Sequence, residues 1–446
     1  MSVFDSQIYR AHFATPEMRA VFSDARLVDY WLRFEVELAA AQAELGVIPK
    51  EAADAIAKAA VSANIDLVKL GQDTHRVGRP IAPLLSQVKA AGGKFVADHL
   101  HLGSTTQDPM DTATVLQIRD GLDIVQRDLR MLILKLADLA EVHKATPMIA
   151  RTNGQDAIPT TLGMMLASYM TELHRHSDRL QSARKRVLVG QFGSAVGTLS
   201  SAGPQGLKTR ALLMKRLGLA EPDLSWNASR DNYAEVVLTL ALLHGTFGRV
   251  ATDINLWSRT ADNGINEGEG GASSTMPQKR NPRAAEFLGG LAELARMRAG
   301  GAMAMMGQSE TRQGGPWISE WSTIPEMFLL TSASLDKAIR LFSKLIVRSD
   351  VLLERFNDSQ QYAMAEAVQT WITPKAGRGP ANDLIKAAIK KAQAGTPFKQ
   401  VILGDAKLRG LVGTENIDKL LAPGSYLGLA PEMVAQAVGK ARAAFP

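Results

Sequence analysis

The sequence predicts an all-α protein with a long central helical bundle. Apolar residues recur every three or four positions over segments of roughly 25 to 35 residues, which as helices would be about 40 to 50 Å long. Strand-like alternation is nearly absent, and only residues 187–196 are expected to include short extended structure. An apolar content of 46% and a charged content of 22% are those of a globular chain.

The order of these segments indicates three parts. Residues 1–107 carry short helical patterns such as 27–45 and form the expected N-terminal helical domain. Residues 351–446 have short patterns again and form the expected small C-terminal helical domain. The long helices of the central part, residues 108–350, are expected at 108–143, 160–189, 231–261, 283–306 and 324–347. Because their apolar residues cover much of the helix circumference, we expect the bundle to pack against further copies of the chain.

Composition and charge narrow the functional classes. The chain has no cysteine, which excludes disulfides and fits a reducing compartment, so we expect a cytoplasmic protein. We expect no membrane span, because no apolar run reaches the required length, and no signal peptide. The net charge is +6 with both signs interspersed, which indicates no nucleic-acid partner but suits an acidic substrate. No metal-ligand spacing or nucleotide-binding glycine loop is recognisable, so neither a metal nor a cofactor is expected.

The segment 268–282 is the most distinctive stretch of the sequence. It combines glycines with Ser273 and Ser274, followed by Met276, Lys279 and Asn281. Two prolines exclude a continuous helix here. Hydroxyls and a cation on a flexible loop can close over an anion, although a solvated linker is the alternative.

GGASSTMPQKRNP closely resembles the signature loop of the fumarase/aspartase superfamily, with Ala272 in place of a glycine. Further matches are HLGSTTQDPMDT, ARTNGQDAIPTTLG, QFGSAVGTLS, SRDNYAE and LAPGSYLG, and they are most similar to 3-carboxy-cis,cis-muconate cycloisomerases and adenylosuccinate lyases. The resemblance implies a three-part fumarase/aspartase-like fold and a homotetramer whose active sites are shared between subunits. It also implies a small polycarboxylate substrate that loses a proton next to a carboxylate.

The resemblance assigns roles within the signature loop. Ser273 corresponds to the catalytic base, with Ser274 as a possible substitute for it. Lys279 would stabilise the alkoxide of the base and, with Asn281, hold a substrate carboxylate. Met276 lies among the substrate-binding residues of the same loop.

The segment Ser104, Thr105, Thr106 and Gln107 precedes a predicted helix start. Hydroxyls and free N–H groups at a helix N-terminus form a natural carboxylate site, so we expect these four residues to bind substrate and Asp108 to cap the helix. Capping alone is the alternative for the whole segment.

The segment 151–156 departs from the family pattern. Related lyases have a histidine as general acid where this chain has Asn153, and the cycloisomerases have a histidine where it has Asp156. We expect Asn153 and Gln155 to contact substrate and Asp156 to act as an acid or base. Pairing of Asp156 with Arg151 is the alternative for that carboxylate.

Arg230 is predicted to clamp a carboxylate, with a structural ion pair as the alternative. Arg79 is a weaker candidate for a second clamp, and His75 and His101 are not assigned a role. Glu286 either matches an electrostatic partner of the lyases or pairs with Arg283 three residues earlier.

Loss of the usual histidine argues against amine elimination, which needs an acid for the leaving nitrogen. The main hypothesis is therefore an isomerase of the 3-carboxymuconate cycloisomerase type. The alternatives are an epimerase of an N-substituted aspartate such as iminodisuccinate, a C–N lyase that releases fumarate, and a catalytically inactive structural tetramer.

Overall fold

A computed structural model of the chain describes residues 2–268, 270–272, 275–358 and 362–445. Across them the chain is predominantly helical and its few strands pair two by two, which confirms the predicted all-α class. The chain forms two compact units, one made of 1–128, 176–245 and 291–336 (unit 1), the other of 129–175, 246–290 and 337–446 (unit 2). Each unit is built from separated segments, and the division at residues 107 and 350 stays a prediction.

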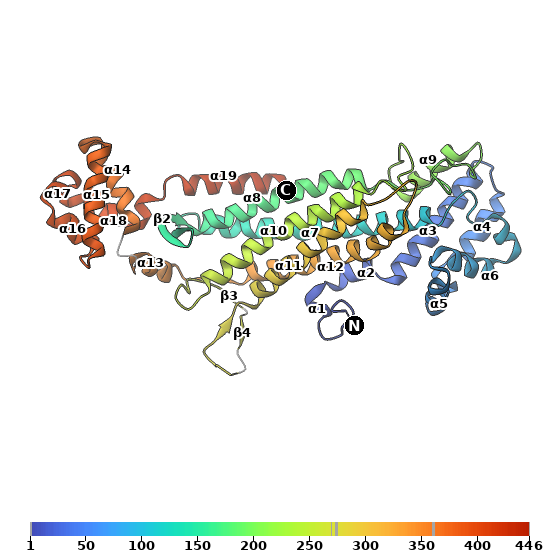
Figure 1. The fold of residues 1–446 in the computed structure, drawn as a ribbon, viewed down its shortest axis with the longest axis horizontal. Coiled ribbons are helices and arrows are strands. Elements are labelled where there is room, and N and C mark those ends of the chain that lie inside the picture. Colours follow the sequence, from blue (N-terminus) through green and yellow to red (C-terminus); the bar gives the residue numbers. More distant parts are fainter. Residues whose placement is uncertain (1, 269, 273–274, 359–361, 446) are drawn as a thin grey trace. The chain divides into compact units, whose positions relative to one another are not determined.

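The N-terminal part of unit 1 consists of short helices, as expected. Helix α3 (Asp24–Glu44) corresponds to the predicted segment 27–45 and begins where the Ser23 hydroxyl accepts the N–H of Arg26. It packs against α4 and α9 (Figure 1). The short helices of this unit are α1 (Arg10–Phe13), α2 (Pro16–Val21), α4 (Lys50–Ala59), η1 (Ser62–Asn64), α5 (Leu67–Val77), α6 (Ile81–His99) and α9 (Gly206–Leu217).

The long helices follow the apolar periodicity of the sequence. Their inward-facing residues, such as Leu116, Leu122 and Leu129, have no exposed surface. The helices are α7 (Gln107–Val142), α8 (Leu162–Val187), α10 (Asp231–Trp257), α11 (Arg283–Met305) and α12 (Gly314–Ser343). All but α12 begin within two residues of the predicted position.

Helix α12 begins ten residues before the predicted start at residue 324. Pro325 lies inside it, although proline lacks the N–H that an interior helical position donates and crowds the carbonyl four residues earlier. Ile324 and Met327, on the two sides of this proline, are both buried. Packing of the apolar face therefore overrides the local cost of the proline.

The sequence prediction missed a β-hairpin in unit 2. Strand β1 (Pro147–Thr152) pairs antiparallel with β2 (Gln155–Thr161), and the turn residues are Asn153 (φ 53°) and Gly154 (φ 76°). Two positive φ values are what a two-residue type I′ hairpin turn requires, and Asn-Gly is the preferred pair. In the segment 187–196, expected to be extended, Val189 forms a parallel bridge with Ala220.

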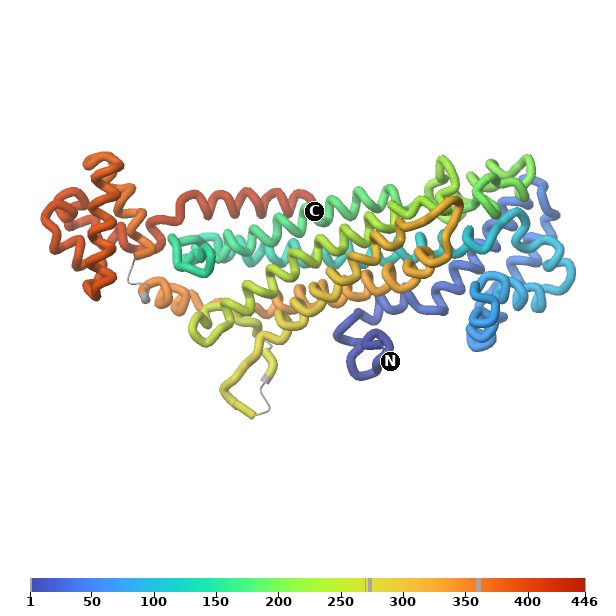
Figure 2. The backbone as a smooth tube through the Cα atoms, in the orientation of Figure 1, coloured from blue at the N-terminus to red at the C-terminus, as the bar shows by residue number. Residues whose placement is uncertain are grey.

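The remaining strands bracket the signature loop in unit 2. Strand β3 (Ile265–Glu267) pairs with β6 (Leu345–Val347), and β4 (Gly271–Ala272) pairs with β5 (Arg280–Asn281). The tube in Figure 2 shows the chain between α10 and α11 projecting as a hairpin from the ends of these helices.

The C-terminal part of unit 2 has its own apolar core, which includes Phe356, Met364, Ile372, Phe398 and Ile402. Helices α14 to α18 form a small cluster around it (Figure 1). Its elements are α13 (Ser349–Asp358), η2 (Tyr362–Met364), α14 (Ala365–Ala376), α15 (Arg378–Gln393), α16 (Phe398–Gly404), α17 (Ala406–Val412), η3 (Thr414–Asn416), α18 (Ile417–Leu421), η4 (Pro423–Tyr426) and α19 (Ala430–Ala444).

Helix α10 is long and apolar enough to cross a membrane, which the sequence analysis did not anticipate. Its most apolar 18-residue window has a mean hydropathy of 1.3, but 67% of that window is buried inside the protein. A core helix of a soluble protein shows the same properties, so this helix is weak evidence for a membrane span.

Candidate carboxylate-binding site

A loop in unit 1 fixes the start of α7. Asp108, which has no exposed surface, accepts the backbone N–H of Thr105 at 3.0 Å and of Gly193 at 3.0 Å. The Ser104 hydroxyl donates to the same carboxylate at 3.3 Å. Burial raises the pKa of Asp108 to about 7, although the two backbone bonds lower it. Asp108 therefore holds the loop in place. The Ser104 hydroxyl, predicted to bind substrate, takes part in this anchoring hydrogen bond instead.

A pocket of about 430 Å³ opens beside this loop. Thr105 and Thr106 line it together with Arg79, Arg312 and Trp317, all from unit 1. The guanidinium carbons of Arg79 and Arg312 lie 4.8 and 5.7 Å from the centroid of the Trp317 ring. Within the described residues, neither guanidinium pairs with a carboxylate. The pocket is thus cationic, with hydroxyls at a helix N-terminus on one wall.

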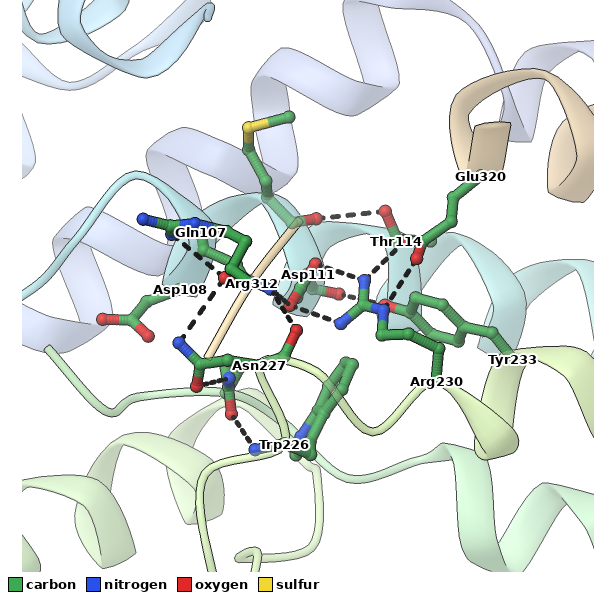
Figure 3. A network of polar contacts seen from close by, with 12 residues as sticks. Gln107, Asp108, Asp111, Thr114, Trp226, Asn227, Arg230, Tyr233, Arg312 and Glu320 are labelled. Carbon is green, nitrogen blue, oxygen red and sulfur yellow. Dashed lines mark hydrogen bonds and ion pairs between the residues drawn. The ribbon is translucent and has the colours of Figure 1, made fainter. Parts of the chain in front are cut away.

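Gln107 connects this pocket to the interior, as Figure 3 shows. Its carbonyl oxygen accepts the Nη1–H of Arg312 at 3.0 Å. Its amide nitrogen donates to Asp111 Oδ2 and to the Asn227 carbonyl, each at 2.9 Å. Gln107 has no exposed surface, so in this structure it positions Arg312 instead of meeting a ligand directly.

Sequence reasoning did not find Arg312. It lies in a polar connection between α11 and α12, where a single arginine is usually solvated. Only the tertiary structure brings it to Gln107, which lies 205 residues away in the sequence. Arg79, by contrast, was a weak candidate and does line the pocket.

Arg230 forms structural ion pairs, which was the alternative to the predicted carboxylate clamp. Its side chain is 0% exposed; Nη1 and Nη2 donate to Asp111 at 2.8 and 2.9 Å, and Nε donates to Glu320 at 2.7 Å. The pKa of Arg230 is raised well above its usual value by the two carboxylates, which outweigh the effect of burial. In Figure 3 the guanidinium faces these carboxylates, so the predicted substrate clamp has no support in the geometry.

The three candidates of segment 151–156 lie on the hairpin of unit 2. Asn153 occupies the turn, and Gln155 and Asp156 begin β2 with exposed side chains. Asp156, 45% exposed, accepts from Arg151 Nε at 2.9 Å, while Arg151 Nη2 lies 2.8 Å from Asp262 Oδ1. The pairing of Asp156 with Arg151, which was the alternative to an acid or base role, is therefore present, but near the surface and not buried.

The signature loop is only partly within the described residues, and Ser273 and Ser274 lie outside them. Met276 and Lys279 are exposed, and the N–H of Lys279 donates to the Met276 carbonyl at 3.0 Å. Asn281 is half-buried in β5. Pairing of β4 with β5 holds the two ends of the loop together, which a solvated linker would not show.

The base of this loop is anchored in unit 2. Both carboxylate oxygens of Glu267 accept the N–H of Ala284, at 3.0 and 2.8 Å, in the first turn of α11. A side chain at Gly268 would bring its Cβ within 2.5 Å of the Lys344 carbonyl oxygen. A glycine is therefore needed at position 268 so that the backbone can pass close to the carbonyl of Lys344. The sequence had suggested a different reason for it, namely loop flexibility.

Two other charged residues have structural partners. Glu286 bonds to Arg283 at 2.6 Å on the exposed face of α11, as the ion-pair interpretation expects. His101 lies 2.7 Å from Glu35, and the negative charge of Glu35 outweighs burial and raises the pKa of the imidazole. His75 is exposed. Among the described residues, no group of three His, Cys, Asp or Glu side chains could hold a metal ion.

The whole chain resembles known enzymes. Residues 9–295 match the family described as Lyase. The chain is 36% identical to trans-aconitate decarboxylase 1 of Mycosarcoma maydis, over 93% of this chain and 85% of that protein. It is also 36% identical to 3-carboxy-cis,cis-muconate cycloisomerase of Pseudomonas aeruginosa, over 98% of this chain and 96% of that protein. The crystal structure of the 3-carboxy-cis,cis-muconate lactonizing enzyme from Pseudomonas putida matches with a TM-score of 0.93 at 33% identity, over 98% of this chain and 99% of that one.

The helical fold, the paired signature loop and these matches define an enzyme of the lyase type. More particularly, the chain belongs to the fumarase/aspartase superfamily, and its relatives include 3-carboxy-cis,cis-muconate cycloisomerases.

Proposed function

We propose that this enzyme is a polycarboxylate isomerase of the 3-carboxy-cis,cis-muconate cycloisomerase type. The observation that carries this proposal is the pocket in which Arg79 and Arg312 both lack a carboxylate partner among the described residues. The names of the two relatives, which refer to trans-aconitate and to 3-carboxymuconate, support an acidic substrate.

Each guanidinium of the pocket can take one carboxylate. Both guanidinium carbons lie over the Trp317 ring at cation–π distance. One Nη1–H of each arginine donates to a neighbouring carbonyl oxygen, and the other N–H groups can hold a carboxylate. The hydroxyls of Thr105 and Thr106 lie where α7 begins, at the positive end of its dipole. A ligand with two or more carboxylates would satisfy both cations, whereas a monocarboxylate would leave one without a counter-charge.

The proposed chemistry is proton transfer at the carbon next to a carboxylate. In the direction of lactone opening, Ser273 takes the proton, the electron pair left on carbon is delocalised into the neighbouring carboxylate, and the ring carbon–oxygen bond then breaks. Lactone formation runs these steps in reverse: a carboxylate oxygen adds to the double bond and Ser273 delivers the proton to carbon. The resulting dianion needs fixed positive charge, which Lys279 would supply, with Asn281 as a further donor. Asp156 is the proposed group that returns a proton, and Asn153, Gln155, Ser274 and Met276 are the proposed further substrate contacts.

A C–N lyase that releases fumarate is the second candidate, favoured by the family description Lyase. Written in the direction of bond cleavage, lactone opening and amine elimination begin with the same proton abstraction. They differ in whether a carbon–nitrogen bond breaks in the next step.

We further propose a cytoplasmic homotetramer with active sites completed by residues of several subunits. Large apolar side chains are exposed on the long helices, among them Leu242 on α10 and Met297 and Met303 on α11, at 56%, 68% and 61%. Surfaces of this kind are typical of subunit interfaces.

One experiment separates the reactions. The purified protein is incubated in D₂O with 3-carboxymuconate, adenylosuccinate and the stereoisomers of iminodisuccinate, and products are followed by NMR. We expect isomerisation of 3-carboxymuconate. Release of fumarate would contradict the isomerase proposal, and deuterium entering an unchanged skeleton of iminodisuccinate would indicate epimerisation instead.

The assignment of the base is tested with a matched pair of variants. Ser273→Ala should abolish activity, while Ser274→Ala should retain a measurable part of it. The reverse pattern would move the base to Ser274.

A further inference from the structure

The pocket lined by Arg79 and Arg312, called the carboxylate pocket below, adjoins a cluster of polar side chains inside unit 1 (Figure 3). The members of this cluster are at most 4% exposed, and they are Gln107, Asp111, Asn227 and Arg230. Burial of charged groups costs free energy, so a buried ion pair is weak evidence for a stabilising role. Because Gln107 bonds to Arg312, the cluster can instead act on ligand binding at the pocket.

The side-chain amide of Gln107 uses all of its donors and acceptors. Its two Nε2 hydrogens go to Asp111 Oδ2 and to the backbone carbonyl of Asn227, each at 2.9 Å. Its oxygen accepts from Arg312 Nη1 at 3.0 Å and from Asn227 Nδ2 at 3.4 Å. A flipped amide would turn its oxygen toward two acceptors and its NH2 group toward two donors. The surroundings of Gln107 therefore select a single orientation, in which the oxygen faces Arg312.

Asp111 is the charged acceptor among the groups that hold this amide. Hydrogen bonds to a charged acceptor are stronger than those to a neutral carbonyl, so Asp111 is the main anchor of the Gln107 NH2 group. Its own oxygens accept from Arg230 Nη1 and Nη2 at 2.8 and 2.9 Å, in a bidentate pair. Arg230 is held in turn by Glu320. The carboxylate that anchors Gln107 is thus itself fixed from the core.

This arrangement also keeps the charge of Arg312 available to a ligand. The negative charge of Asp111 is balanced by Arg230, and the amide that bonds to both Asp111 and Arg312 is neutral. A carboxylate in the place of that amide would pair with Arg312 and offset the charge that an anionic ligand needs. A neutral amide holds the guanidinium without neutralising it.

We propose that Asp111, fixed by Arg230, is a positioning residue of the carboxylate pocket, which anchors the Gln107 amide so that its oxygen holds Arg312. The inference rests on the proposed function, because a polycarboxylate is the ligand that reports on the pocket. It gives the buried ion pair of Arg230 a role in binding, although this arginine does not reach the ligand itself. Loss of the anchor leaves Gln107 and Arg312 free to move, and ligand affinity falls.

Asp111→Leu and Asp111→Asn form a matched pair, since both remove the negative charge beside Arg230 and only asparagine keeps an oxygen that can accept from Gln107. Dissociation constants of trans-aconitate are measured by calorimetry with the full chain. We expect binding about tenfold weaker in Asp111→Leu and within about threefold of the wild type in Asp111→Asn. The control is Asp128→Leu, because this buried carboxylate on α7 pairs with Arg127 and should leave the affinity unchanged. Equal losses in the two Asp111 variants would overturn the proposal.

A double-mutant cycle tests whether Asp111 acts through Arg312. Arg312→Met removes the guanidinium that Gln107 holds. In that background, Asp111→Leu should change the dissociation constant of trans-aconitate by less than about twofold, because no group remains for it to position. Losses that multiply independently would show that Asp111 acts by another route, and the proposal would be wrong.

A triple variant guards against the failure of Asp111→Leu to fold with Arg230 partly unpaired. It combines Asp111→Leu, Arg230→Met and Glu320→Leu, since apolar replacement of a buried ionic triad is often neutral or stabilising. This variant should be folded by circular dichroism and should bind trans-aconitate about tenfold more weakly than the wild type. Wild-type affinity in the folded triple variant would show that the ion pairs act on stability alone.

Crystal structures separate failure of this inference from failure of the proposed function. Arg312 Nη1 lies 3.0 Å from Gln107 Oε1, and this hydrogen bond should be lost in Asp111→Leu and in the triple variant. An unchanged bond would overturn the positioning role even where trans-aconitate binds. A wild type that binds no trans-aconitate would contradict the proposed substrate class, while loss of the bond in the variants would still confirm that Asp111 places Arg312.

Discussion

Arg79 and Arg312 stack on the same indole, with guanidinium carbons 4.8 and 5.7 Å from the centroid of the Trp317 ring. They come from the first and the last of the three sequence segments that form unit 1, and they meet only in the folded chain. Two like charges on one ring repel each other unless anions lie between or beside them. The two neighbouring cations therefore support the proposed ligand with several carboxylates.

Arg312→Lys should raise KM for the polycarboxylate substrate about 10- to 100-fold. Lysine keeps the charge but loses the planar fork that can hold both a carboxylate and the Gln107 carbonyl oxygen. Steady-state kinetics measure the change. Arg76→Lys on the exposed surface of α5 is the control and should leave KM unchanged. An unaltered KM in Arg312→Lys would remove this residue from the binding site.

Arg79→Gln should weaken binding of a tricarboxylate more than binding of a dicarboxylate. The glutamine removes one of the two pocket cations, so the ligand with more negative charge loses more. Dissociation constants of trans-aconitate and fumarate, measured by calorimetry with the wild type and the variant, give the comparison. Equal losses for both ligands would show that Arg79 contributes only a general attraction.

The contribution of Asp108 to stability should fall as the pH rises from about 4 to 7. Burial raises the pKa of this carboxyl from 3.8 to about 7. Between those values the folded protein binds one more proton here than the unfolded chain does. The contribution of Asp108 to stability is therefore complete below pH 3.8 and is lost as the pH rises through about 7, by at most about 1.4 kcal/mol per pH unit.

Urea unfolding at a series of pH values measures this slope. Asp108→Asn cannot titrate, so its free energy of unfolding should depend less steeply on pH than that of the wild type, although the variant is less stable because one oxygen that accepts an N–H is lost. Parallel curves for the two proteins would show that Asp108 does not change its protonation in this range.

The long helices could be predicted because their periodicity is set by a local rule. Segment 108–143 was expected to be helical and α7 is Gln107–Val142, since an apolar stripe every three to four residues has no other stable arrangement. The start of α12 could not be placed, because Pro325 is a local stop signal that the buried neighbours override. Local periodicity therefore predicted which segments are helical, whereas packing determined the helix start at the one place where a local stop signal was overridden.

The candidate site also contains residues that local sequence predicts and residues that only tertiary contacts bring there. Thr105 and Thr106 were predicted from hydroxyls before a helix, and both line the pocket. Arg312 and Trp317 could not be predicted as pocket residues, since they reach the site through Gln107 and Arg79, which are far away in the sequence and leave no local signal. Arg230 was interpreted from its motif as a clamp, but the motif contains neither Asp111 nor Glu320. The Asn153-Gly154 turn did have a signal, and the sequence analysis overlooked it because the segment was interpreted by its family role.

Asn153→Gly should keep the hairpin and lower kcat/KM about fivefold. Glycine adopts the positive φ of 53° freely, so the turn is retained, while a side-chain hydrogen bond to substrate would be lost. Asn153→Val is the contrasting variant, because a left-handed conformation costs a branched residue about 1–2 kcal/mol. Thermal unfolding and kinetics are measured on both. If Asn153→Gly has full activity, this asparagine serves the turn and not the substrate.

Asp156→Asn should lower kcat about 100-fold and remove one limb of the pH–rate profile, as expected for a group that transfers a proton. The carboxylate is 45% exposed and paired with Arg151, so a structural ion-pair role has to be distinguished from proton transfer. Arg151→Met removes the partner but keeps the carboxylate, and should therefore retain the pH limb. Asp262→Asn is the control for the rest of the cluster, since it leaves the bond between Arg151 and Asp156 in place. Equal losses in Asp156→Asn and Arg151→Met, with profiles of unchanged shape, would mean that Asp156 acts only by holding Arg151. The proton-returning group would then have to be sought elsewhere.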